Sequence, residues 1–111
     1  MKYHSLNYNS QNVSFLNAVR KGLAPDRGLY FPEKIPKISK KFIQSIGSYS
    51  NNEIAFEVIH PFVGNEISKN KLREIIADTL IFDFPIVPIN NKISTLELFH
   101  GPTLALSLIH I

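Results

Sequence analysis

The sequence predicts an α+β fold that begins with a small, mainly helical domain containing short strands. Three observations support this class. Apolar side chains recur at helical spacing between residues 13 and 82, short strand-like runs precede and follow this region, and proline, glycine and asparagine separate the two patterns. The change of pattern near residue 82 predicts one domain over 1–82 and the start of another over 83–111.

The N-terminal third predicts a strand, a helix and a second strand. Side chains of residues 3–8 alternate between two faces, as in a short strand. A helix follows over 13–22, with Ser14 as its N-cap and Gly22 at its end. The stretch 24–32 then predicts a tight turn at its proline and aspartate, followed by a strand that ends at the second proline.

The middle of the chain predicts an extended connection and two helices. Prolines keep the stretch 33–41 extended until a short helix that Ser39 caps. Ser50 and Glu53 have the spacing of a capping box, which predicts a helix from residue 51 onward. Pro61 removes an amide donor from this helix, so we expect a kink or a break near His60.

A third helix is the strongest prediction, and two strands follow it. Ser68 caps the helix 69–82, whose apolar stripe consists of Leu72, Ile75, Ile76, Thr79 and Leu80. The runs 84–89 and 95–99 then predict two short strands that are joined by a polar turn at Asn90–Asn91.

Composition restricts the classes of function. With 111 residues, 44% hydrophobic and 19% charged, the chain is globular and too short for a complete large enzyme. It contains no cysteine, which excludes thiolate chemistry, and no histidine pair with metal-binding spacing, so we expect no metal site. The net charge of +3 signals nucleic-acid binding only weakly, and no apolar run could span a membrane. We therefore expect a cytoplasmic protein that binds neither nucleic acid nor membrane.

His100 is the candidate functional residue that the pattern itself offers. It lies between a strand-like run and the turn Gly101-Pro102-Thr103, where a strand end would present polar groups. A histidine in this position is also compatible with a simple turn residue, and the pattern leaves both interpretations open.

Two motifs resemble signatures of the threonine synthase family, and they occur in the family's order. The first is the segment from Ser14 to Pro32, which includes GLAPDRGLYFP, and the second is LELFHGPTLA at 96–105. In that family the second signature continues into Phe-Lys-Asp-Phe, and its lysine forms a Schiff base with pyridoxal 5'-phosphate. In this sequence Ser107 occupies the lysine position, and a hydroxyl group cannot form a Schiff base.

The resemblance implies a fold, an activity and a set of site residues. It implies that 83–111 is a truncated start of a fold-type II pyridoxal-phosphate domain, with 106–111 as an atypical tail. The parent activity is that of a lyase of threonine biosynthesis, which converts O-phospho-L-homoserine and water to L-threonine and phosphate. His100 and Thr103 are expected near the cofactor. We expect no catalytic residue and no covalently bound cofactor in this chain, which should be an inactive fragment.

Two further expectations concern association. Unpartnered strands should expose apolar side chains and promote self-association, the residues concerned being Phe84, Ile86, Val87, Leu96, Leu98 and Phe99. The alternative to a fragment of an enzyme is a non-catalytic α+β module that binds a partner. An exposed aromatic or basic patch with no role in domain docking would favour that alternative.

Overall fold

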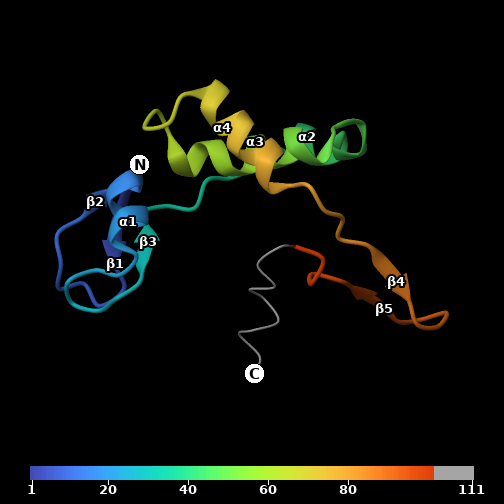
Figure 1. The fold of residues 1–111 in the computed structure, drawn as a ribbon, viewed down its shortest axis with the longest axis horizontal. Coiled ribbons are helices and arrows are strands. Elements are labelled where there is room, and N and C mark those ends of the chain that lie inside the picture. Colours follow the sequence, from blue (N-terminus) through green and yellow to red (C-terminus); the bar gives the residue numbers. More distant parts are fainter. Residues whose placement is uncertain (102–111) are drawn as a thin grey trace. The chain divides into compact units, whose positions relative to one another are not determined.

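A computed structural model describes residues 1–101 and contains both helices and short strands (Figure 1). The chain divides into two compact units, Met1–Ile76 and Ala77–Ile111. The described elements agree with the predicted α+β class.

A three-stranded antiparallel sheet opens the first unit. Strand β1 (Lys2–Ser5) lies between β2 (Val13–Ser14) and β3 (Tyr30–Pro32). Tyr3 pairs with Val13 on one side and with Pro32 on the other, and its side chain is only 7% exposed. The strands β1 and β3 were predicted, whereas β2 was not, because two residues are too few to show an alternating pattern.

Helix α1 (Phe15–Lys21) has both predicted ends. The Ser14 hydroxyl accepts a hydrogen bond from the amide of Asn17 at 3.4 Å. Gly22 has a φ of 68°, and its amide donates to the carbonyl of Ala18 at 3.0 Å. The left-handed backbone at this position favours glycine over any residue with a Cβ.

A short helix and a 3₁₀ turn follow the extended connection. Helix α2 (Lys40–Gln44) begins where predicted, because the Ser39 hydroxyl accepts from the amide of Phe42 at 3.2 Å. The turn η1 (Ile46–Ser48) comes directly after it. The residues from 33 to 39 form no regular element, as their prolines predict.

Helix α3 (Asn51–Val63) has the predicted capping box but not the predicted break. The Ser50 amide donates to Glu53 at 2.8 Å, and the Ser50 hydroxyl accepts from the Glu53 amide at 3.3 Å. The helix continues through Pro61 to Val63, so of the kink or break expected near His60 the break is wrong. Val63 is 1% exposed, and burial of this last turn offsets the loss of one amide donor.

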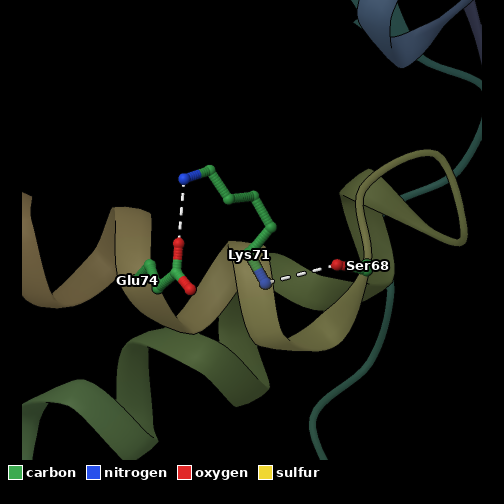
Figure 2. Close-up of polar contacts among 3 residues, drawn as sticks. All are labelled: Ser68, Lys71 and Glu74. Atoms are coloured by element: carbon green, nitrogen blue, oxygen red, sulfur yellow. Dashed lines mark hydrogen bonds and ion pairs between the residues drawn. The ribbon is translucent and has the colours of Figure 1, made fainter.

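Helix α4 (Lys69–Thr79) begins at the predicted cap but ends earlier than expected. The amide of Lys71 donates to the Ser68 hydroxyl at 3.3 Å, and Lys71 Nζ lies 2.8 Å from a carboxylate oxygen of Glu74 (Figure 2). Leu72 and Ile76 are each 3% exposed and form the buried part of the predicted stripe. Residues 80–83 lie outside the helix, and Pro85 disfavours helical backbone at Phe84 as well.

The second unit contains the predicted hairpin. Strands β4 (Ile86–Pro88) and β5 (Ser94–Leu96) pair antiparallel, with Ile86 opposite Leu96. The Asn90 side-chain oxygen accepts from the amides of Lys92 and Ile93 at 2.9 and 3.0 Å, which closes the turn. The residues of both strands are exposed, as is each of the six apolar side chains for which exposure was expected.

Candidate functional site

The candidate site begins where strand β5 ends. The amide of Glu97 donates to the carbonyl of Pro85 at 3.0 Å, which extends the hairpin pairing by one hydrogen bond beyond the strands. This bond fixes the backbone of Glu97 against the start of β4. The chain then runs through Leu98 and Phe99 to His100 without regular secondary structure.

Glu97 and Phe99 hold the side chain of His100 in this segment. Its Nε2 lies 2.7 Å from a carboxylate oxygen of Glu97, and the two side chains are 38% and 25% exposed, respectively. The imidazole stacks on the ring of Phe99, with ring centroids 4.6 Å apart and an interplanar angle of 30°. The imidazole therefore has a defined position while still being accessible to solvent.

Gly101 lies against an aromatic pair. A Cβ at this position would lie 2.9 Å from Cζ of Phe82, a separation that real Cβ atoms do not show. Phe82 in turn makes an edge-to-face contact with Phe84 at 5.6 Å between ring centroids. Any residue with a Cβ at this position would therefore displace the Phe82 ring.

The other predicted site positions, Thr103 and Ser107, lie outside the described residues. Among residues 77–101 the one primary amine of a side chain is that of Lys92, at the hairpin turn, and the one glycine is Gly101. A pyridoxal-phosphate site needs a lysine that reaches the aldehyde and backbone amides that bind the phosphate. The described residues do not by themselves fit that cofactor.

A second polar cluster, which sequence reasoning missed, surrounds Asp26 in the first unit. Its Oδ1 accepts from the Ser5 hydroxyl at 2.6 Å and the Gly28 amide at 3.0 Å, and its Oδ2 accepts from the Asn9 amide at 2.9 Å. The Ser5 hydroxyl, followed by the Gly28 and Asn9 amides, lowers the pKa of the Asp26 carboxyl below its ordinary value despite some desolvation. The cluster joins two loops and is structural.

Glu66 is a second carboxylate with a long-range role. Its two oxygens accept from the amides of Phe15 and Leu16 at 3.0 and 3.1 Å, so it caps helix α1 from a distant loop. Desolvation raises the pKa of the Glu66 carboxyl, but the helix amides, the Ser14 hydroxyl and the N-terminal ammonium outweigh it and lower the pKa overall. A sequence separation of 51 residues hides this contact from motif analysis.

A cavity of about 340 Å³ lies on the first unit between the connection 35–39 and helix α3. Its lining is mainly apolar and includes Ile38, Phe42, Val58 and Phe62. The residues that line it all belong to the first unit. In the part of the chain that the structure describes, no helix is long and apolar enough to cross a membrane.

Comparison with known proteins identifies the family. The family model described as threonine synthase N terminus matches residues 2–80. The threonine synthases of Escherichia coli K12 and Schizosaccharomyces pombe are 33% and 38% identical to this chain over 105 and 112 residues, respectively. Each match covers 95% of this chain but 24% and 22% of the relative. The chain therefore spans about a quarter of the length of the curated relatives it matches.

Solved structures give the same result. The crystal structure of the E. coli threonine synthase matches with a TM-score of 0.83 and 32% identity, over 93% of this chain and 24% of that protein. A PLP-bound threonine synthase from Brucella melitensis matches with a TM-score of 0.83 and 35% identity, over 94% of this chain and 24% of that protein. The match includes both the helices of the first unit and the hairpin that precedes His100. The chain therefore belongs to the threonine synthase family, and it matches the N-terminal region of that family.

Proposed function

We propose that this chain supplies the N-terminal region of a cytoplasmic threonine synthase. The whole enzyme would convert O-phospho-L-homoserine and water to L-threonine and phosphate, as a lyase of amino-acid biosynthesis. The observation that carries the proposal is the structural match at a TM-score of 0.83, which extends over 93% of the chain rather than over one motif. We assign 1–82 to the N-terminal domain and 83–111 to the start of the catalytic domain.

The cofactor of the whole enzyme would be pyridoxal 5'-phosphate. The PLP-bound relative from Brucella melitensis supports this assignment. Bound in the whole enzyme, this cofactor would withdraw electrons from the substrate. We place His100 and Thr103 near it, and we assign the remaining binding groups to regions of the relatives that this chain does not match.

We further propose that the 111 residues alone do not catalyse the reaction. Ser107 occupies the position of the family's lysine, and the chain matches about a quarter of its relatives. Borohydride reduction in the presence of pyridoxal 5'-phosphate, followed by peptide mapping, should give scattered lysine adducts without turnover. One stoichiometric adduct accompanied by phosphate release from O-phosphohomoserine would overturn this part of the proposal.

A hybrid enzyme tests the parent function directly. Residues 1–101 of this chain would replace the matching region of the E. coli threonine synthase, and phosphate release from O-phosphohomoserine would be measured. We expect the hybrid to turn over this substrate, because the two regions share their fold and 32% of their residues and should therefore pack on the same catalytic domain. A soluble, cofactor-loaded hybrid without turnover would contradict the proposal. The unmodified E. coli enzyme is the positive control.

The alternative, a non-catalytic binding module, is favoured by one observation. The cavity beside α3 is lined by Lys37 and by apolar side chains of the connection, with Ile35 being 66% exposed. This surface belongs to the first unit. A hybrid that is inactive while the isolated chain is a stable monomer would favour the module over the enzyme.

A further inference from the structure

We propose that Glu97 is a positioning residue for His100. Its carboxylate accepts a hydrogen bond from the protonated Nε2 of the imidazole, which leaves Nδ1 as the acceptor nitrogen at the site. The inference rests on the proposed function, because it assigns a role to the histidine of the candidate site. It is carried by the 2.7 Å contact between Nε2 and the Glu97 carboxylate.

The chemistry of the pair determines which nitrogen carries the proton. An ionised carboxylate is an acceptor only, so a hydrogen bond at this distance requires a proton on Nε2. In a neutral imidazole the other nitrogen then has a free lone pair. Among residues 1–101 no hydrogen bond to Nδ1 of His100 is present, and the proposal assigns this nitrogen to a ligand or to a proton in transfer.

The backbone of Glu97 is anchored to the hairpin. Its amide bonds to the carbonyl of Pro85 at 3.0 Å, which ties it to the strand β4 side of the hairpin. Its side chain is 25% exposed, compared with 63% for Glu74 in the surface ion pair of α4 (Figure 2). A less exposed and anchored carboxylate loses less entropy when it binds a partner.

Neighbouring aromatic rings restrict the remaining freedom of the imidazole. Phe99 stacks on it at 4.6 Å, and the following residue, Gly101, lies close to the Phe82 ring. The imidazole is thus limited by a carboxylate at Nε2, by a ring on one face and by the backbone that follows it. This arrangement, in which a carboxylate orients a histidine whose other nitrogen has no hydrogen-bond partner among residues 1–101, suits a group that moves a proton.

Nitrogen-15 NMR of the 111-residue chain tests the proposal without any cofactor. Long-range correlation spectra distinguish the two ring nitrogens of each neutral histidine, and His100→Asn assigns the signals of residue 100. We expect His100 to show the Nε2-protonated tautomer alone, with a slowly exchanging Nε2 proton. In Glu97→Ala we expect a mixture of tautomers and loss of the slowly exchanging proton. Glu97→Gln should restore part of the effect, because its amide oxygen can accept the same hydrogen bond.

Glu74→Gln is the matched control, since it removes an acidic side chain that lies elsewhere, in helix α4. It should leave the His100 signals unchanged. Backbone amide spectra of each variant show whether the hairpin remains folded. A His100 protonated on Nδ1 in the unmodified chain, or signals that are identical in the unmodified chain and Glu97→Ala, would overturn the proposal.

The hybrid enzyme separates this proposal from the proposed function. In an active hybrid, Glu97→Ala should lower kcat about 10-fold to 100-fold with little change in KM, and Glu97→Gln should recover part of the loss. An equal kcat in the hybrid and its Glu97→Ala variant would count against a positioning role. Failure of the unmodified hybrid would count against the proposed function, whereas the tautomer of His100 is decided by the NMR experiment on the chain itself.

Discussion

The hydroxyl of Ser5 donates a 2.6 Å hydrogen bond to the carboxylate of Asp26, although 21 residues separate them in the sequence. Ser5 is fully buried at the end of strand β1, and Asp26 lies in the loop that leads to β3. The same hydroxyl accepts from the amide of Asn7 at 3.2 Å. The Ser5 side chain therefore joins the end of strand β1 to the loop around Asp26, which belongs to the first family signature.

Removal of the Ser5 hydroxyl should weaken the first unit. Ser5→Ala leaves the Asn7 amide without its acceptor and the Asp26 carboxylate without its shortest bond, in a buried position. We expect a loss of about 1–3 kcal/mol in the free energy of unfolding, measured by urea titration with circular dichroism. Ser48→Ala, at an exposed serine in η1, should change it by less than about 0.5 kcal/mol. Equal effects of the two variants would contradict the role assigned to Ser5.

Two glycines offer a matched test of close packing. A Cβ at Gly28 would collide with the Ser5 hydroxyl and would lie 2.9 Å from the Asn7 amide nitrogen, whereas one at Gly47 would have nothing within 4 Å. Gly28→Ala should therefore destabilise the protein by about 1–3 kcal/mol, as overpacked sites do. Gly47→Ala should be neutral or should stabilise it by up to about 1 kcal/mol. The thermal midpoints of the two variants check this difference, and a harmless Gly28→Ala would show that the loop can move apart.

Local chemistry accounts for the parts of the fold that could be predicted. The caps at Ser14, Ser39 and Ser50 involve groups within three residues of each other, so their spacing in the sequence is their spacing in the helix. The hairpin was predictable for a similar reason, because its turn and both strands lie close together in the chain. These elements are confirmed.

Long-range contacts account for what the sequence could not predict. Apart from the local bond of Asp26 to the Gly28 amide, the carboxylates of Asp26 and Glu66 bind groups 17 to 51 residues away, which no local pattern encodes. The path of α3 through Pro61 depends on burial of Val63 and on the Tyr3 hydroxyl, which donates to the carbonyl of Phe62 at 2.9 Å. At the candidate site, the motif identified His100, whereas its partner Glu97 emerged only from the geometry.

Acid should destabilise the first unit through its two bonded carboxylates. Hydrogen bonds from Ser5, Gly28 and Asn9 hold the pKa of Asp26 below 3.8, and the α1 amides hold the pKa of Glu66 below 4.5 in spite of desolvation. The folded state therefore binds fewer protons than the unfolded state in this range. The stabilisation is fully present above these ordinary values and is lost as the pH falls through the lowered ones.

Thermal unfolding between about pH 6 and pH 2 measures this loss. Asp26→Asn removes one of the carboxyls, so its midpoint should start lower and should fall less steeply with acid than that of the unmodified chain. Asp78→Asn, on the exposed face of α4, is the control and should keep the original steepness. Parallel curves for the unmodified chain and Asp26→Asn would show that Asp26 does not contribute to acid sensitivity.

The hairpin of the second unit should make the isolated chain self-associate. Ile86 and Leu96 are cross-strand partners that are 70% and 57% exposed, and Phe99 beyond them is 52% exposed. A two-stranded hairpin also leaves both of its edges open for pairing with another strand. Burial of these side chains between copies would be favourable by roughly 25 cal/mol for each Å² of apolar surface removed from water. Sedimentation velocity at rising concentration should therefore show increasing mass.

Substitution of the two hairpin partners distinguishes association through the hairpin from non-specific association through other exposed apolar side chains. Ile86→Thr combined with Leu96→Thr keeps residues suited to strands but reduces the apolar surface, so the double variant should remain monomeric at higher concentration. Val19→Thr is the control, because Val19 is 62% exposed on helix α1 in the other unit. It should associate like the unmodified chain. If Val19→Thr abolished association and the hairpin variant did not, the contact surface would lie on the first unit, and the exposed strands of the second would be stable in water without a partner.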